Sequence, residues 1–286
     1  MLLITGHKGF VGSNLCVELK RRGLDFVGYD LQDGDDIRDK CKLDRFFEEN
    51  QVTEIVHLAA LAGVRRGELY PADYIFTNIL GTNNLVELAE KYGVKKIVFF
   101  SSSSVYGQGK PPIKEDDAKK PISIYGITKL AGEKIIERCK IPFWVILRPF
   151  TIYGENGRRD EVIYKWVNQV KNKKPITVYG NGGSERGYVY IKDIVSVVLK
   201  ILFEKHAVSK MDLNIGGSEV IKLSEIIAEF KKVFLAAKFE TLPLPESDVK
   251  SNFANITKAG DWLEFNPKKK FIKNLRLILK KEKKNL

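Results

Sequence analysis

Cysteine is scarce in this chain, and its placement argues against a disulfide scaffold. The 286 residues include 3 cysteines, an odd number without the spacing of metal ligands: Cys16, Cys41 and Cys139. Unpaired thiols are typical of a reducing compartment, so we expect a cytoplasmic protein with no bound metal.

Long apolar runs are absent as well. No stretch of the sequence reaches the roughly 20 apolar residues that a membrane-spanning helix needs, so we expect no membrane segment. Met1 leads directly into a predicted strand, and we therefore expect no signal peptide.

Acidic residues are outnumbered by basic ones. There are 36 Asp and Glu against 48 Lys and Arg, a formal net charge of +12, which raises the question of nucleic-acid binding. Much of the excess lies near the carboxyl end, at 268–270 and 280–284, without an aromatic or glycine-rich RNA-binding signature. We predict a solvated lysine-rich terminal helix and no nucleic-acid partner; the positive field would favour an anionic substrate.

The amino-terminal pattern predicts a strand, a glycine turn and a helix. The apolar run Met1–Thr5 ends at glycines 6, 9 and 12, and a helical pattern follows over Ser13–Arg22. Glycines at these positions allow a tight turn and a close approach of the backbone to a pyrophosphate, which the amino end of the helix then binds. The turn alone is a weak signal.

A second strand over Asp25–Asp30 strengthens this interpretation. Asp30 lies about 20 residues beyond the glycine turn, where a ribose 2′-hydroxyl needs an acceptor. A carboxylate there should repel a 2′-phosphate, which favours NAD over NADP. The alternative is an ordinary aspartate that makes a turn at the end of the strand.

Predicted strands and helices alternate along the rest of the chain. We expect strands over Glu54–Ala60, Lys96–Ser101 and Phe143–Leu147, and helices over Leu43–Asn50, Pro71–Tyr92 and Ser123–Arg138. This order predicts an α/β fold with a Rossmann-type, doubly wound parallel sheet. We expect His57 to be a packed strand residue, and an irregular chain from Phe239 to two short terminal helices.

Tyr125 and Lys129 stand out in the predicted helix Ser123–Arg138. They are four residues apart and would point off one face. A neighbouring ammonium lowers the pKa of a phenol, so Tyr125 could accept a proton from a substrate. A hydroxyl from the four consecutive serines at 101–104 could share that proton. An isolated pair of this kind is usually an ordinary helix surface.

The order of the motifs resembles the extended short-chain dehydrogenase/reductases, specifically the NAD-dependent nucleotide-sugar epimerases and dehydratases. The matching segments, in order, are Thr5–Gly12, Asp30, Asp36-Ile37, His57–Ala60, Asn78–Thr82, Ser101–Gly107, Tyr125–Lys129, Arg148–Phe150 and Arg186–Asp193. The resemblance implies an NAD-binding Rossmann domain over 1–150, returning at about 187–215. It also implies a smaller, interleaved α/β substrate-binding domain over 151–286.

The resemblance implies a role for each matching residue. Tyr125 would be the catalytic base, Lys129 its electrostatic partner and Ser102 the bridging hydroxyl. NAD would contact Gly6, Gly9, Phe10, Val11, Gly12, Asp30, Asp36, Ile37, Leu58, Ala59, Ala60, Asn78, Ser101, Tyr125, Lys129 and Pro149. A nucleotide sugar would contact Ser102, Ser103, Thr151, Arg158 and Arg186.

The resemblance also narrows the set of reactions that we expect. Ser103 and Ser104 stand where 4,6-dehydratases have an Asp-Glu pair, and Thr151 and Arg158 match residues that hold the sugar carboxylate in uronate 4-epimerases. The resemblance thus implies a homodimer that epimerises C4 of a UDP-hexose or UDP-hexuronate through a 4-keto sugar.

The sequence leaves other functions open. Alternatives of the same fold are a UDP-glucuronate decarboxylase and a nucleotide-sugar reductase or dehydratase. A dinucleotide-binding sensor without catalysis is a third, although such a protein would be expected to lose Tyr125 or Lys129.

Overall fold

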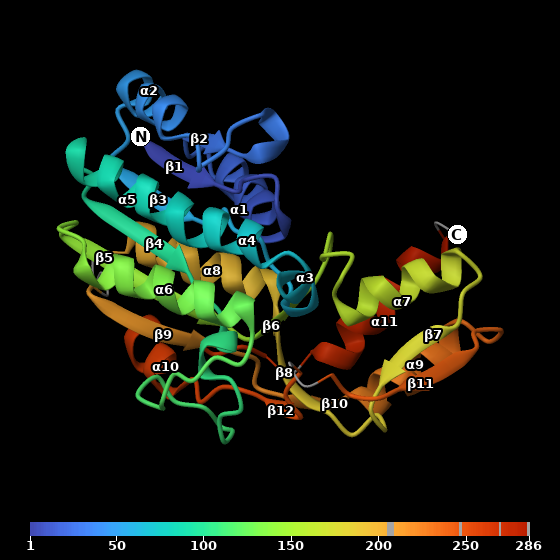
Figure 1. Cartoon of the computed structure of the whole chain (residues 1–286). Helices are drawn as coiled ribbons and strands as arrows, with labels where there is room; N and C mark the ends of the chain where they lie inside the picture. Colours follow the sequence, from blue (N-terminus) through green and yellow to red (C-terminus); the bar gives the residue numbers. More distant parts are fainter. Residues whose placement is uncertain (205–208, 246–247, 269, 285–286) are drawn as a thin grey trace.

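The computed structural model describes residues 1–204, 209–245, 248–268 and 270–284, and its centre is a six-stranded parallel sheet (Figure 1). The strands lie in the order β2 (Phe26–Tyr29), β1 (Leu2–Thr5), β3 (Glu54–His57), β4 (Lys96–Phe100), β5 (Phe143–Pro149) and β9 (Met211–Ile215). The predicted α/β, Rossmann-type class is confirmed. No helix in these four ranges is long and apolar enough to cross a bilayer.

Alternate side chains of each strand supply two separate cores. Leu2 and Ile4 face one core and Leu3 the other, as the period of two in a strand requires. The first face is covered by α1 (Phe10–Arg21), α8 (Ile191–Phe203) and α10 (Thr257–Leu263). The second is covered by α2 (Lys40–Asn50), α5 (Thr82–Lys91) and α6 (Ile124–Arg138). A sheet buried on both faces explains why its strands are almost wholly apolar.

The winding of the chain reverses around β1, which lies between β2 and β3. Open parallel sheets leave a crevice at such a reversal, beyond the carboxyl ends of the strands. The glycine turn after β1 and the serines after β4 both lie at this edge. The topology therefore places the two predicted parts of the site together.

A smaller lobe stands beside this edge (Figure 1). Its strand β8 (Glu185–Tyr190) pairs with β6 (Thr151–Tyr153), β10 (Val220–Lys222) and β12 (Ser251–Asn252), while β7 (Ile176–Tyr179) pairs with β11 (Phe239–Leu242). The lobe has an aromatic core that includes Trp166 and Phe230. Three helices pack around this core: α7 (Val162–Lys171), α9 (Leu223–Val233) and α11 (Phe271–Lys284). The domain boundary at residue 150 stays a prediction.

Several local predictions were wrong. The chain is not irregular after Phe239, because β11 pairs in parallel with β7, a partner that no local pattern reveals. The first helix begins at Phe10 instead of Ser13, and 71–92 is broken into α4 (Pro71–Ile75), a π-helical segment η2 (Phe76–Gly81) and α5. No local pattern indicated β6, β10 or α3 (Val64–Leu69) either.

The lysine-rich terminal helix is confirmed for the described residues, which leave out Lys269. In α11, Leu275 and Leu279 are buried, whereas Lys280, Lys281, Lys283 and Lys284 are exposed. At 14 residues, α11 is longer than the short helix expected here. Its charge faces solvent because its apolar stripe is used for packing on the lobe.

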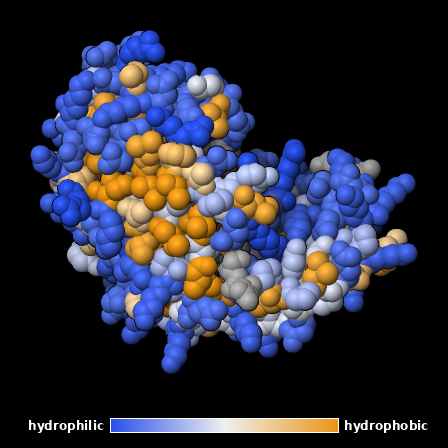
Figure 2. Space-filling model, in the orientation of Figure 1, coloured by the Kyte–Doolittle hydropathy of each residue, from blue (hydrophilic) through white to orange (hydrophobic). Residues whose placement is uncertain are grey.

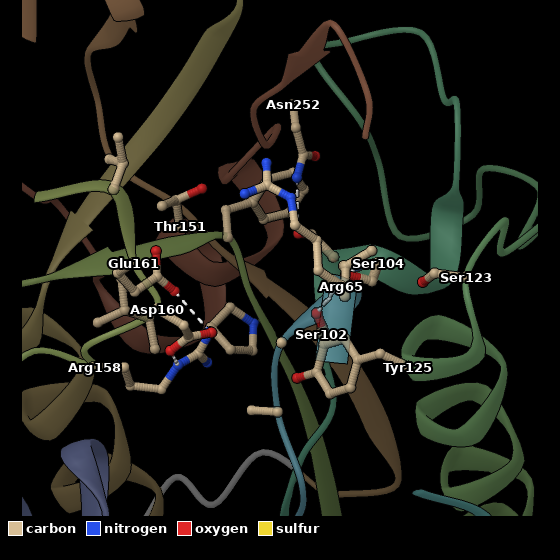
Figure 3. Close-up of a pocket in the computed structure, with 18 of the residues that line it drawn as sticks. Arg65, Ser102, Ser104, Ser123, Tyr125, Thr151, Arg158, Asp160, Glu161 and Asn252 are labelled. Carbon is tan, nitrogen blue, oxygen red and sulfur yellow. Dashed lines mark hydrogen bonds and ion pairs between the residues drawn. The ribbon is translucent and has the colours of Figure 1, made fainter. Parts of the chain in front are cut away.

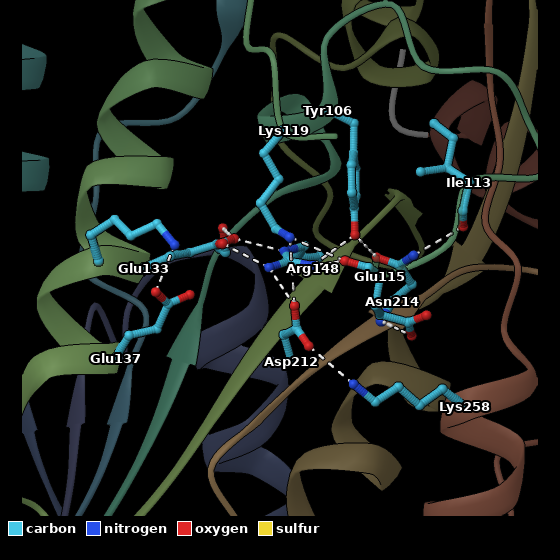
Figure 4. Close-up of polar contacts among 12 residues, drawn as sticks. Tyr106, Ile113, Glu115, Lys119, Glu133, Glu137, Arg148, Asp212, Asn214 and Lys258 are labelled. Carbon is cyan, nitrogen blue, oxygen red and sulfur yellow. Dashed lines mark hydrogen bonds and ion pairs between the residues drawn. The ribbon is translucent and has the colours of Figure 1, made fainter. Parts of the chain in front are cut away.

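A buried ion pair fastens α6 to the sheet (Figure 4). Arg148 of β5 and Glu133 of α6 are both fully buried, and the guanidinium donates to the two carboxylate oxygens at 2.8 Å each. Arg148 also contacts Asp212 of β9 at 2.6 Å, and Glu133 accepts a hydrogen bond from the Ser101 hydroxyl. Strands β5 and β9, the end of β4 and α6 therefore meet at one charged centre.

We predict that Arg148→Met destabilises the protein by about 3–5 kcal/mol, because Glu133 would stay buried without its counter-charge. Urea unfolding measures this change. The double variant Arg148→Met/Glu133→Leu should recover most of the loss; equal stability of the single variant and the wild type would show that the pair does not fasten α6.

Candidate active site

A cleft of about 820 Å³ lies at the carboxyl edge of the main sheet and receives side chains from the smaller lobe. Most of the predicted site residues line it, although they come from positions far apart in the chain. These are Gly6, Gly9, Phe10, Val11, Gly12, Leu58, Ala60, Ser101, Ser102, Ser103, Tyr125, Lys129, Pro149, Thr151, Arg158 and Arg186. The fold thus brings the expected cofactor, catalytic and substrate residues into one cavity.

Five predicted cofactor residues do not line this cavity: Asp30, Asp36, Ile37, Ala59 and Asn78. The buried Asp30 carboxylate accepts hydrogen bonds from the backbone N–H groups of Lys8 and Gln32, both at 2.9 Å. Asp30 therefore lies beside the glycine turn that contains Lys8. Asp36 is paired with Arg38 on the surface.

Asn78 holds the loop that follows β3. Its side-chain amide bonds to both backbone groups of Leu61, accepting at 2.7 Å and donating at 2.9 Å, and also donates to the Thr128 hydroxyl at 3.0 Å. Ile37 packs below Gly81, where a Cβ would lie 2.6 Å from its side chain. For Asn78 and Ile37, contact with the cofactor stays a prediction.

The glycine turn has the shape that a pyrophosphate requires. Gly6 has φ +72° and its carbonyl accepts from the Gly9 N–H at 3.0 Å. A Cβ on Gly12 would lie 2.3 Å from that carbonyl oxygen, so only glycine allows helix α1 to start this close to the turn. Gly9, at the amino end of α1, makes no side-chain cap, which leaves the first N–H groups for an anion.

Helix α6 aims Tyr125 and Lys129 at the cleft. The helix starts firmly because the Ser123 hydroxyl accepts from the Gly126 N–H at 3.1 Å. Tyr125 lies in its first turn, and Lys129 lies one turn further on the same face. Ser102 lies in the turn after β4 and accepts from the Ser104 N–H at 3.1 Å, so its hydroxyl is also held (Figure 3).

The protonation of this pair differs from the prediction. Burial raises the pKa of Tyr125, while the Arg158 guanidinium and a hydrogen bond to Ser102 work against it. We expected Lys129 to lower the pKa of Tyr125. This prediction was wrong for the protein alone, because the effect of burying the phenol is larger. Burial also lowers the pKa of Lys129 to about 7, although the negative charge of Glu133 raises it. The Nζ atom of Lys129 lies 4.5 Å from the centre of the Phe99 ring.

His57 is structural, as predicted. Its buried ring lies between two hydroxyls, with Nδ1 2.7 Å from Thr5 Oγ1 and Nε2 3.0 Å from Thr82 Oγ1. Burial lowers the pKa of His57 to about 3, so the ring stays neutral at physiological pH.

The substrate side of the cleft contains charges that the motifs did not reveal (Figure 3). Arg158 is bound by Asp160, with Nε and Nη2 each 3.0 Å from a carboxylate oxygen, and by Glu161 at 2.9 Å. The only sequence signal for these acids is that they directly follow the Arg158-Arg159 pair. They make Arg158 part of a charge cluster and not an isolated cation.

Two other arginines are held by the smaller lobe. Arg186 donates to the carbonyls of Val249 at 2.7 Å and Lys250 at 3.1 Å. Arg65 of α3 pairs with Asp248 at 2.7 Å, and its guanidinium lies 3.8 Å from the centre of the Tyr179 ring. Asn252 donates to the Ser103 hydroxyl at 2.9 Å. No local pattern pointed to Arg65 or Asn252, because their place at the cleft depends on tertiary packing.

The parallel sheet, the glycine turn at its switch point and the Tyr125/Lys129 pair define a dinucleotide-binding α/β enzyme of the Rossmann class. The chain belongs to the NAD dependent epimerase/dehydratase family, whose model matches residues 2–216.

Solved and curated relatives cover almost the whole chain. The UDP-glucuronate 4-epimerase of Thermodesulfobacterium geofontis is 31% identical, over 99% of this chain and 96% of that protein. The structure of UDP-glucuronic acid 4-epimerase from Bacillus cereus with UDP-glucuronic acid and NAD matches 100% of this chain and 99% of its own, with a TM-score of 0.90 and 29% identity. The UDP-glucose 4-epimerase of Thermus thermophilus in complex with NAD gives the same coverage and TM-score at 26% identity.

We predict that the stability of the protein freed of bound nucleotide rises with pH above 7. The pKa of Lys129 is about 7 in the folded protein and near the ordinary 10.5 when unfolded. Between these values the unfolded chain binds more protons, so rising pH favours folding. Urea unfolding at pH 7 and 9 tests this: Lys129→Met should flatten the rise, whereas the exposed control Lys20→Met should keep it. An identical pH slope in Lys129→Met and wild type would contradict the prediction.

Proposed function

We propose that this protein is an NAD-dependent epimerase that inverts C4 of a UDP-linked sugar. The observation that carries the proposal is that one cleft contains the phenol of Tyr125, the hydroxyl of Ser102, the amine of Lys129 and the glycine turn. The relatives named above act at this carbon, and two of their structures contain NAD.

The residues present fit NAD. The turn at Gly6, Gly9 and Gly12 and the free N–H groups of α1 would hold the pyrophosphate, and Asp30 would accept from the adenosine ribose. Lys129 would bind the other ribose. When bound, NAD supplies an acceptor for the C4 hydride and returns that hydride to the sugar.

Tyr125 is the proposed acid and base. It takes the proton of the C4 hydroxyl as the carbon is oxidised, and gives a proton back when the 4-keto sugar is reduced from its other face. Ser102 holds the same hydroxyl, with the Tyr125 phenol beside it. Burial raises the pKa of Tyr125. In the protein alone, Arg158 and the hydrogen bond to Ser102 lower it only in part, because Glu161 and Asp160 raise it further.

The predicted substrate residues line the cleft with both charged and hydroxyl groups. Arg186, together with Arg65 and Lys165, places positive charge where the smaller lobe borders the cleft, which suits a diphosphate. Ser103 and Thr151 line the same cleft and offer hydroxyls to the sugar. The cleft thus offers positive charge to a diphosphate and hydroxyls to a carbohydrate.

We predict that Tyr125→Phe lowers the rate of epimerisation by about 10²–10⁴-fold, because the proposed acceptor of the C4 proton is lost. NMR of UDP-glucose or UDP-glucuronate, incubated with purified protein and no added NAD, measures the product. Tyr92→Phe, which removes a half-buried phenol bound to Asp44 and outside the cleft, is the matched control and should keep the rate.

A full rate in Tyr125→Phe would contradict the assignment of the base. Release of carbon dioxide from UDP-glucuronate, or steady consumption of NADH, would instead indicate the decarboxylase or reductase alternative.

The proposed enzyme pairs with a second copy of itself through the α4–α6 apolar patch, formed by Ile75, Phe76, Leu80 and Ile127. These side chains are between 44% and 53% exposed and form an apolar area over α4 and α6 (Figure 2). None carries charge, whereas the chain has a net charge of +12. Two such molecules repel each other over most of their surface and meet best at an uncharged face.

We predict that Phe76→Glu converts a dimer into a monomer, because two carboxylates would be buried in one symmetric contact. Light scattering after size-exclusion chromatography gives the mass. Leu235→Glu, at a side chain 85% exposed and outside the patch, is the control and should stay dimeric. A wild-type mass near 32.5 kDa at micromolar concentration would rule out the pairing.

A further inference from the structure

Arg158 is already neutralised within the cleft. Asp160 binds its Nε and Nη2 edge at 3.0 Å, and Glu161 contacts Nη2 at 2.9 Å. Among the described residues, these contacts leave only Nη1 for another carboxylate. One guanidinium and two ionised carboxylates carry one negative charge in excess, and the more distant Arg186 guanidinium also acts on Glu161.

Glu161 is the more sheltered of the two acids. Its side chain is 27% exposed, against 54% for Asp160. Its backbone is fixed at the start of α7, where its N–H donates to the Arg158 carbonyl at 3.1 Å and its carbonyl accepts from Lys165 at 2.8 Å. Charge at Glu161 is therefore held in place and poorly screened by water.

The cluster acts directly on the phenol of Tyr125, the proposed acid and base. Arg158, Asp160 and Glu161 all act on the pKa of the Tyr125 phenol, and Figure 3 shows them on the side of the cleft that the phenol faces. In a pyranose, C6 is attached to C5, the neighbour of C4. A sugar whose C4 hydroxyl reaches Tyr125, with its C5 side turned toward Arg158, brings its C6 group toward this cluster.

We propose that Glu161 makes the site selective for sugars with an uncharged C6 group and against uronates. This rests on the proposed function and names its substrate class. A C6 carboxylate would meet one free guanidinium nitrogen and two fixed negative charges, whereas a C6 hydroxyl can donate to either carboxylate. Selectivity thus comes from a repulsive charge as much as from an attractive contact.

The selectivity should depend on pH. Burial raises the pKa of Glu161, and the negative charge of Asp160 also raises it. The positive charges of Arg158 and Arg186 lower it, but burial has the larger effect. The phenols of Tyr125 and Tyr188 also face this carboxylate. Protonation removes the charge that repels a uronate, so the preference for the neutral sugar weakens as the pH falls through the pKa of Glu161.

Isothermal titration of UDP-glucose and UDP-glucuronate into the purified enzyme tests the binding preference, and NMR of the C4 epimers tests turnover. The wild type should bind UDP-glucose at least about 10-fold more tightly, the effect of one unfavourable charge contact. Glu161→Gln should remove most of this preference. Glu161→Asp, which keeps the charge, should restore it, and that rescue separates a charge effect from misfolding.

Asp160→Asn is the matched comparison, since it also takes one carboxylate from Arg158 but at a more exposed position. It should change the preference less than Glu161→Gln. Equal binding of the two nucleotides by the wild type, or an unchanged ratio in Glu161→Gln, would overturn the inference. A binding preference without turnover of either sugar would uphold it and reject the proposed epimerase.

Discussion

The site depends on the buried contact between Arg148 and Glu133. Tyr125 and Lys129 belong to α6, while Ser101 and Ser102 directly follow β4, and neither element can position the site alone. Glu133 binds the Ser101 hydroxyl and the Arg148 guanidinium together, so it sets how far α6 lies from the sheet. Asp212 then ties the same arginine to β9. Two buried charges are tolerated because every partner is in place.

Glu133 also reaches the chemistry. It lies one helical turn beyond Lys129, and its field opposes the loss of charge that burial imposes on that lysine. Glu133 and the proposed catalytic pair therefore share one helix and one electrostatic environment. Burial favours a neutral phenol and a neutral amine, and the charged groups around them decide how much of the ionised forms survives.

The sequence predicted the features that depend on local patterns. Glycines 6, 9 and 12 indicated the turn, alternating strands and helices indicated the sheet, and the spacing of Tyr125 and Lys129 placed both on one helical face. Strand β11 and the contacts of Arg65 could not be predicted, because each is formed with a partner distant in the chain. The pKa of Tyr125 was misjudged for the same reason: burial is a property of the folded molecule.

The central claim is that C4 is oxidised and reduced within one binding event. UDP-glucose labelled with deuterium at C4 tests it most directly, when incubated with purified protein in ordinary water and without added nucleotide. We predict UDP-galactose that keeps the deuterium at C4, as followed by NMR and mass spectrometry. Loss of the label to water, or a requirement for a stoichiometric external oxidant, would contradict this account.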